Sequence, residues 1–153
     1  EEVHTLLDVG GNTGRFALRC VDFNPKVQVT IMDLPQQLSL MQEHIKGKKG
    51  ADRIYAYPAN LLDPAVPFRA AAAMTADSRL YILEAYWDRQ QHETGAYCLT
   101  QISVYFTVMA NGNSKMYYSQ DMIDCVEKAG LKVEAIYDHL GSGNSHTLFK
   151  IRR

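Results

Sequence analysis

The residues of this 153-residue chain that are best suited to bind a ligand are a group of glycines and carboxylates. The run Asp8-Val9-Gly10-Gly11-Asn12-Thr13-Gly14 follows a short apolar segment and precedes an amphipathic one. Glycine lets the backbone approach a ligand closely, and the amides at the start of a helix attract anionic groups. Asp33 ends a second apolar segment, and Glu84 ends a later one. The pattern predicts a nucleotide-like ligand beside the glycine loop, where an α/β sheet has its binding crevice.

The spacing of the glycines argues against a nicotinamide cofactor. Starting at Gly10, the pattern G-x-G-x-x-G requires a glycine where Asn12 stands, and starting at Gly11 it requires one at position 13. Asp8, two positions before the first glycine, disfavours a pyrophosphate but suits a ligand with an ammonium and a sulfonium group. S-adenosylmethionine carries both groups, and its carboxylate suits the loop amides. A plain tight turn is the alternative interpretation of the loop.

Asp33 is the predicted ribose ligand. It lies at the C-terminal end of the second apolar segment, 25 positions after Asp8. A carboxylate there can accept hydrogen bonds from both ribose hydroxyls. Taken alone, an aspartate that starts a helix explains this position equally well. The glycine loop favours the ribose interpretation.

The elements that must position these residues alternate in the first part of the chain. Apolar segments predict strands at Thr5–Val9, Val27–Met32 and Arg53–Tyr57. Helical spacing predicts one helix with Phe16, Ala17 and Cys20, and a second from Pro35 with Leu38, Met41 and Ile45 on one face. This alternation implies a parallel sheet with right-handed crossovers, whose strands are buried on both faces.

The later part of the chain does not alternate strands and helices in the same regular way. A buried strand is predicted at Leu80–Ala85 and a long helix at Thr94–Met109. Asn111 begins a turn, and Ser119 is the predicted N-cap of a further helix that ends at Gly130. Strands at Lys132–Tyr137 and His146–Ile151, joined by a Gly-Ser-Gly-Asn link, predict an antiparallel pair.

The alternation is interrupted after the third predicted strand. Asn60 to Phe68 is typical of a loop, and Arg69 to Met74 is typical of the last turns of a helix rather than of a whole helix. We therefore expect that one strand, one helix and their loops, roughly 25 to 35 residues, are missing between Phe68 and Arg69. The missing segment would contain the fourth strand.

Composition sets the fold class and excludes some partners. The length fits one domain, residues 1–153, and 46% hydrophobic with 22% charged residues is typical of a globular protein. The expected fold is α/β, a doubly wound Rossmann-like sheet that is mostly parallel and has the antiparallel pair at its C-terminal end. A net charge of -1 argues against nucleic acid and membrane partners. Three well-separated cysteines predict no metal site and a cytoplasmic protein.

Two segments resemble a known family. Leu6-Leu7-Asp8-Val9-Gly10-Gly11 and Thr30-Ile31-Met32-Asp33-Leu34-Pro35 are similar to segments of the small-molecule O-methyltransferases related to plant caffeate and animal acetylserotonin methyltransferases. The likeness continues through Arg53 to Phe68, Leu80 to Glu84 and Ala129-Gly130-Leu131. It covers most of this chain but only the C-terminal half of a family member. The family's N-terminal helical dimerisation domain has no counterpart here, so the resemblance implies a homodimer only for a longer parent protein.

The resemblance implies a cofactor site for S-adenosylmethionine. By this resemblance the methionine end is held by Asp8, Gly10, Gly11 and Gly14, the ribose by Asp33 and Leu34, and the adenine lies by Asn60 and Leu61. Asn60 departs from the family's usual aspartate, although an amide can still hydrogen-bond to adenine.

The resemblance supplies only part of a catalytic site. The family's general base is a histidine at the end of the fourth strand, and none of His4, His44, His92, His139 and His146 has that context. Glu84 matches the family's first acidic partner of the base, while Met116 stands at the place of the second, and Asn111 matches a position near the acceptor. The expected reaction is O-methylation of a small hydroxylated acceptor. Methyl transfer to nitrogen or carbon, and a non-catalytic cofactor-binding module, are the alternatives.

Overall fold

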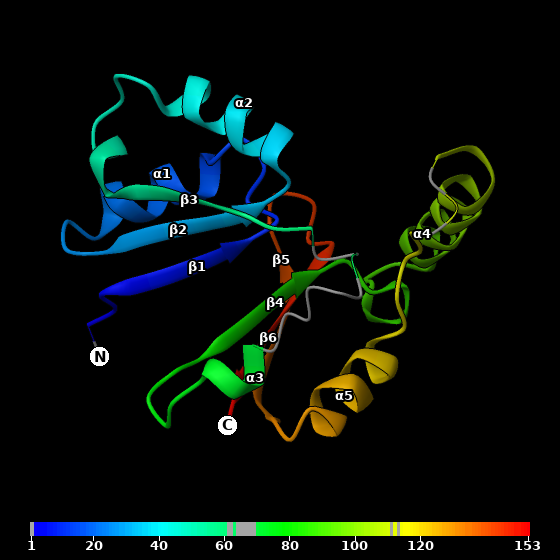
Figure 1. Ribbon diagram of the computed structural model, residues 1–153. Coiled ribbons are helices and arrows are strands. Elements are labelled where there is room, and N and C mark those ends of the chain that lie inside the picture. The colour runs from blue at the N-terminus through cyan, green and yellow to red at the C-terminus, as the bar shows by residue number, and fades with distance from the viewer. Residues whose placement is uncertain (1, 61–62, 64–69, 111, 113) are drawn as a thin grey trace. The chain divides into compact units, whose positions relative to one another are not determined.

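The computed structural model describes residues 2–60, 63, 70–110, 112 and 114–153 (Figure 1). The chain divides into two compact units, Glu1–Phe68 and Arg69–Arg153. We call them unit 1 and unit 2 and describe each by itself. The division falls at the position where the sequence predicts missing residues, and that junction lies outside the described residues.

Unit 1 alternates strands and helices as the sequence predicts. Its elements are β1 (Thr5–Val9), α1 (Arg15–Phe23), β2 (Gln28–Asp33), α2 (Pro35–Ile45) and β3 (Ile54–Pro58). The strands form a three-stranded parallel sheet in the order β1-β2-β3, so β1 lies at one edge. Along the sheet Leu7 is in register with Thr30, and Thr30 with Tyr55.

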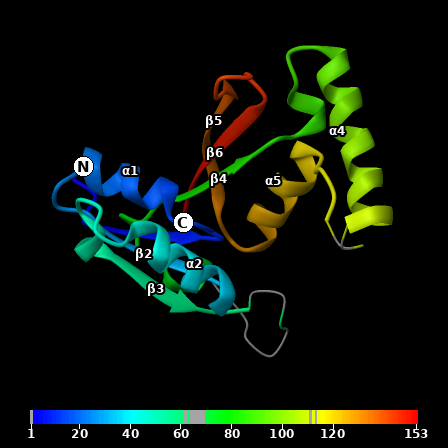
Figure 2. The same ribbon diagram turned by 90° about the horizontal axis from the view of Figure 1, so that it is seen from above.

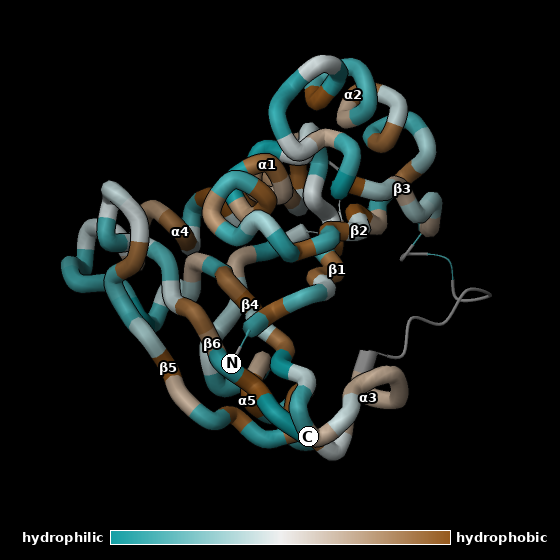
Figure 3. Tube along the Cα trace, turned by 90° about the vertical axis from the view of Figure 1, so that its left-hand side faces the viewer, coloured by the Kyte–Doolittle hydropathy of each residue, from teal (hydrophilic) through white to brown (hydrophobic). Residues whose placement is uncertain are grey.

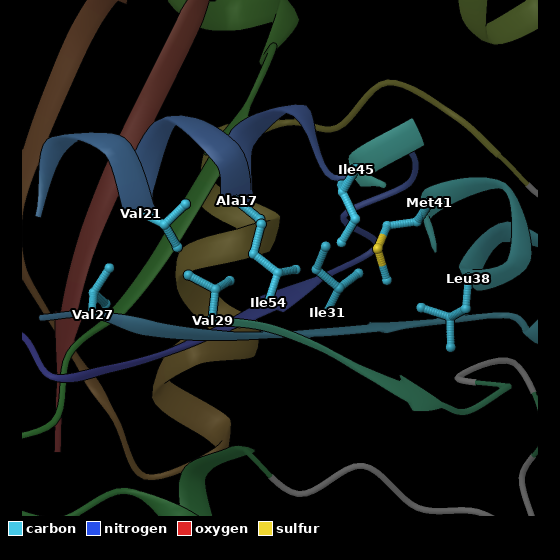
Figure 4. Close-up of a cluster of buried hydrophobic side chains, with 9 residues drawn as sticks. All are labelled: Ala17, Val21, Val27, Val29, Ile31, Leu38, Met41, Ile45 and Ile54. Carbon is cyan, nitrogen blue, oxygen red and sulfur yellow. The ribbon is translucent and has the colours of Figure 1, made fainter. Parts of the chain in front are cut away.

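The core of unit 1 lies between the sheet and its two helices, which cover the same face (Figure 4). The helical period explains α2, because the three apolar residues predicted to share a face, Leu38, Met41 and Ile45, are all buried. The other core members are Ala17, Val21, Val27, Val29, Ile31 and Ile54.

The opposite face of the unit 1 sheet is apolar and open. Leu7 and Val9 on β1 are each 44% exposed, and Tyr55 and Tyr57 on β3 are 46% and 54% exposed. We expected strands buried on both faces, as in other parallel sheets. That expectation is wrong for this face, because the helices of unit 1 pack on the other one.

Arg53 joins the end of α1 to the start of β3. Its guanidinium donates hydrogen bonds to the carbonyls of Val21 (2.6 Å), Asn24 (3.0 Å) and Val27 (3.0 Å). These carbonyls lie at the C-terminal end of α1 and in the following turn, where a cation is favoured by the helix dipole. Arg53 thus fixes the exit of α1, and with it the start of β2.

Unit 2 contains an antiparallel sheet and three helices. Its elements are α3 (Ala70–Ala73), β4 (Leu80–Glu84), α4 (Glu93–Tyr105), α5 (Ser119–Lys128), β5 (Lys132–Leu140) and β6 (His146–Arg152). The sheet order is β4-β6-β5, with both pairings antiparallel. Hydrophobic and hydrophilic residues alternate along β5 and β6 (Figure 3), and the predicted antiparallel pair is confirmed. The α/β class with a parallel part is likewise confirmed, but the described strands form two sheets.

Three local predictions in unit 2 need correction. β4 was predicted to be buried, but Tyr81 and Leu83 are more than half exposed, and among the described strands β4 pairs only with β6. The long helix is α-helical only to Tyr105 and continues in π-helical geometry from Phe106 to Ala110 (Figure 2). Ser119 is the first residue of α5 rather than its N-cap; its amide donates to Asp88 Oδ1 and its hydroxyl to Asp88 Oδ2.

Candidate cofactor site

The glycine loop connects β1 to α1 in a tight turn. The amide of Gly10 donates to the carbonyl of Met32 (2.8 Å), and that of Gly14 donates to the carbonyl of Gly11 (3.0 Å). Gly10 and Gly14 have φ values of +72° and +74°, which favour glycine. The first turn of α1 receives no hydrogen bond from a capping side chain within the described residues. Its first amides therefore have no side-chain acceptor in this part of the chain and are available to an anionic group.

Gly11 allows the loop to lie directly on Asp8. A Cβ at position 11 would lie 2.5 Å from Asp8 Oδ2, 2.8 Å from Asp8 Cγ and 2.9 Å from Ile31 Cγ2. Real Cβ atoms do not approach other atoms so closely, so this position requires glycine in the present backbone. The hydrogen at position 11 therefore lets the loop close over β1.

Asp33 is fixed by the backbone on both sides. The amide of Leu34 donates to its Oδ1 (2.7 Å), and the amide of Asn12 in the glycine loop donates to its Oδ2 (3.0 Å). The carbonyl of Asp33 accepts a hydrogen bond from Ala59 (3.0 Å) beyond β3. Each carboxylate oxygen can accept a second hydrogen bond. The side chain therefore sits between the loop and the exit of β3 with acceptor capacity for a ribose.

Sequence reasoning missed the role of Asn12. This residue has φ of +51°, a left-handed conformation that asparagine tolerates better than most residues, and its amide thereby reaches Asp33. The signal was an asparagine between two glycines, which is typical of a left-handed turn position.

One carboxylate oxygen of Asp8, the buried Oδ2, has no hydrogen-bond donor in the part of the chain that the structure describes. Burial raises the pKa of the Asp8 carboxyl, and the nearby negative charge of Asp33 raises it further. The pair concentrates negative potential beside the loop, which suits a cationic ligand.

The remaining predicted cofactor residues are placed in part. Leu34 precedes α2 and is 41% exposed. Asn60 follows the Asp33–Ala59 contact and is exposed, and its carbonyl accepts a hydrogen bond from Asp63 (3.1 Å). Leu61 lies outside the described residues. The structure thus brings together Asp8, the three glycines and Asp33.

The predicted catalytic and acceptor residues belong to the segment of unit 2. Glu84 ends β4, half-buried, and its Oε1 accepts a hydrogen bond from the amide of Ala85 (2.8 Å). Asn111 lies outside the described residues. Met116 is half-buried, and its amide donates to Ser103 Oγ (2.9 Å). All five histidines are exposed or half-buried: His4, His44, His92, His139 and His146.

The segment after Glu84 is held firmly. Tyr86 is fully buried and stacks on Phe149 at 5.0 Å, and burial raises the pKa of its hydroxyl. Arg89 donates two hydrogen bonds to Asp138, at 2.7 and 2.5 Å, which lower the pKa of that carboxyl. The backbone directly after Glu84 is therefore anchored by packing and by an ion pair.

The tyrosines of α4 do not belong to a hydrophobic core among the described residues. Tyr97 and Tyr105 are exposed, and no residue of α4 is buried in the described part of the chain. Trp87 stacks on Tyr118, with ring centroids 5.1 Å apart.

No helix among the described residues has the length and apolar character needed to cross a membrane. Nor do the described side chains include a metal-binding group of three or more His, Cys, Asp or Glu residues.

Comparisons with known proteins agree with this site. The family described as O-methyltransferase domain matches residues 1–81, which include β1, the glycine loop, Asp33 and the start of β4. No curated protein sequence matches the chain significantly.

Solved structures share its fold at low sequence identity. The mitomycin 7-O-methyltransferase MmcR is 22% identical with a TM-score of 0.80, covering 99% of this chain and 49% of its own. An O-methyltransferase family 2 protein from Planctomyces limnophilus, in complex with apigenin, is 17% identical with a TM-score of 0.76. The match covers 97% of this chain and 50% of that protein. NcsB1 from neocarzinostatin biosynthesis, in complex with S-adenosylmethionine and a naphthoic acid, is 15% identical with a TM-score of 0.74, at 98% and 49% coverage.

The chain thus spans about half the length of the solved structures that it matches. The family match extends over residues 1–81 of 153, more than half of the chain, and contains the described part of the glycine-loop site. This chain belongs to the O-methyltransferase domain family.

Proposed function

We propose that this chain is the cofactor-binding part of an S-adenosylmethionine-dependent methyltransferase that methylates an oxygen of a small hydroxylated acceptor. The observation that carries the proposal is the carboxylate of Asp33, tied to the glycine loop through the amide of Asn12 at 3.0 Å. Family membership supports it. So does the absence of the glycine spacing that a dinucleotide requires.

The residues fit the cofactor. Asp8 Oδ2 is a buried acceptor without a partner, and Gly11 leaves space that a Cβ would fill. The loop amides and the start of α1 suit the cofactor's carboxylate, and Asp33 suits its ribose. Leu34 and Asn60 are proposed to lie along the ribose and adenine, with Leu61 beside them.

When bound, the cofactor supplies a methyl group on a cationic sulfur. Unit 1 contributes orientation, because methyl transfer requires the acceptor oxygen and the methyl carbon in line. In unit 2 Glu84 is proposed to orient the base that removes the acceptor's proton, with Asn111 near the acceptor. The base histidine itself is not found in this sequence.

The acceptor atom decides between the proposed reaction and its alternatives. Incubation of the intact protein with methyl-labelled cofactor and hydroxylated, amine or carbon-acid acceptors is expected to give labelled ethers. Labelled amines or carbon-methylated products would favour the other reactions. Cofactor binding without any labelled product would favour a non-catalytic module.

The proposal also covers the cellular compartment, the partners and the oligomeric state of the parent protein. The cysteines Cys20, Cys98 and Cys125 are free thiols in the structure, which supports a reducing, cytoplasmic compartment. The acceptor is proposed to be a small molecule, with no nucleic acid or membrane partner. A homodimer is proposed only for the longer protein.

An Asp33→Ala variant is expected to bind S-adenosylmethionine about ten- to a hundredfold more weakly than the original chain. This corresponds to about 1.5 to 3 kcal/mol for hydrogen bonds to a charged group. Calorimetric titration measures the effect. Asp52→Ala removes an exposed carboxylate of the same unit and serves as the control. Equal affinities of the two variants would place the ribose elsewhere.

A further inference from the structure

Tyr86 carries a buried hydroxyl group that lacks a partner among the described residues. The residue follows Glu84 by two positions, its side chain is fully buried, and its ring stacks on Phe149 with the centroids 5.0 Å apart. Within the described part of the chain its Oη has no hydrogen-bond partner. A buried hydroxyl without an acceptor costs free energy, so the native protein is expected to supply one.

The sheet of unit 2 brings Tyr86 to the face that carries the Glu84 side chain. Glu84 on β4 is in register with Thr147 on β6, and Ile82 is in register with Phe149. Side chains two residues apart on a strand share a face, and so do directly opposed residues of paired strands. Because the ring of Tyr86 lies on Phe149, it lies on the same face as Glu84.

Glu84 has acceptor capacity to spare. Its Oε1 accepts the amide of Ala85 (2.8 Å), and the described residues supply no donor for its Oε2. Burial raises the pKa of the Tyr86 hydroxyl, and the negative charges of Glu84 and Asp88 raise it further. The hydroxyl is therefore protonated at neutral pH and is a donor with two carboxylates in its neighbourhood.

The other carboxylates of this region are already occupied. Both oxygens of Asp88 accept hydrogen bonds from Ser119, one from its amide and one from its hydroxyl. Both oxygens of Asp138 accept hydrogen bonds from Arg89, and one of them also accepts the hydroxyl of Thr147 (2.8 Å). The acid at the end of β4 is thus the one with an oxygen left for a further donor.

We propose that Tyr86 is a positioning residue whose hydroxyl donates a hydrogen bond to the Glu84 carboxylate when that carboxylate turns toward it, and so fixes the acid that orients the base. This inference rests on the proposed function of Glu84. The ring of Tyr86 is held against Phe149, so the half-buried side chain of Glu84 supplies the movement. With Ala85 on one oxygen and Tyr86 on the other, each oxygen keeps a second acceptor site for the base.

The carboxyl carbon of Glu84, observed by carbon-13 nuclear magnetic resonance at neutral pH, tests the hydrogen bond without a ligand. Tyr86→Phe removes only the hydroxyl and keeps the ring, and it is expected to move this resonance. Tyr81→Phe is the matched control on β4, because Tyr81 is 52% exposed, and it is expected to leave the resonance in place. A resonance that Tyr86→Phe does not move overturns the inference.

The sign of a stability change separates a bonded hydroxyl from an unbonded one. Tyr86→Phe is expected to lower the urea midpoint of the original chain, but to raise it in a Glu84→Ala background, where the hydroxyl has lost its acceptor. A rise in both backgrounds shows an unbonded hydroxyl. A fall in both assigns the hydroxyl to another acceptor, and either result contradicts the inference.

Methyl transfer by the intact protein tests the positioning role itself. Tyr86→Phe is expected to lower kcat about tenfold with KM for the acceptor unchanged, and to have no further effect in Glu84→Ala. An unchanged kcat overturns that role. Absence of methyl transfer by the original protein overturns the proposed function and the role together, whereas the carboxyl resonance and the urea midpoints still decide the hydrogen bond.

Discussion

A Gly14→Ala variant is expected to lose about 3 kcal/mol of the free energy of unfolding. Gly14 has φ of +74°, and an alanine there costs about 1 to 2 kcal/mol. Its Cβ would lie 3.0 Å from Met41 Cγ, 3.2 Å from Ile31 Cδ1 and 3.3 Å from Ile45 Cγ2, and such overpacking costs about 1 to 3 kcal/mol. Urea unfolding followed by circular dichroism measures the loss.

Gly47→Ala is the matched control. Gly47 has nearly the same conformation, with φ of +73°, but nothing lies within 4 Å of the Cβ that an alanine would add. The control is expected to lose only the conformational part, about 1 to 2 kcal/mol. Equal losses in the two variants would show that contacts around the glycine loop are not responsible.

Trypsin digestion of the protein isolated from its native source is expected to give no peptide Ile54–Arg69. If Phe68 and Arg69 are joined, cleavage after Arg53 and Arg69 releases this peptide intact, because no other lysine or arginine lies between them. We expect instead a sequence that continues beyond Phe68 for roughly 25 to 35 residues, or about 3 to 4 kDa.

The fold supplies the reason for this expectation. The helices α1 and α2 cover one face of the unit 1 sheet while the strand order advances from β1 to β3. Right-handed crossovers that return past β1 place their helices on the opposite face. That face carries exposed apolar side chains, Leu7, Val9, Tyr55 and Tyr57, and β1 pairs only with β2 among the strands that the structure describes.

An added strand beside β1 would also explain the incomplete catalytic site. By the family resemblance the base histidine follows the fourth strand, which is the element that we propose to be missing. Detection of peptide Ile54–Arg69 in the native protein, and of no longer form, would contradict this account. Sequencing the uninterrupted gene is the complementary measurement.

Local periodicity predicted unit 1 well because short-range rules decide its elements. Leu38, Met41 and Ile45 repeat at helical spacing, and all three are buried. The same rules could not predict the partners of a strand. The apolar segment Leu80–Ala85 predicted a buried strand, yet β4 pairs antiparallel with β6 and leaves two large side chains exposed, because pairing depends on distant residues.

The sequence predicted the residues of the candidate site, but not all of their contacts. The residue types of Asp8, the glycines and Asp33 indicated a cationic nucleotide ligand, and the fold brings them together. The sequence could not reveal that Asp8 lies beneath Gly11, because the direction of a side chain under a loop depends on the backbone path.

The central claim is that the glycine loop binds S-adenosylmethionine and not a nicotinamide dinucleotide. Parallel calorimetric titrations of the folded chain with S-adenosylmethionine, its demethylated product and NAD test it most directly. We predict saturable binding of the two methionine cofactors, weakened in Asp33→Ala, and no binding of NAD. Tight binding of NAD without binding of either methionine cofactor would contradict the account.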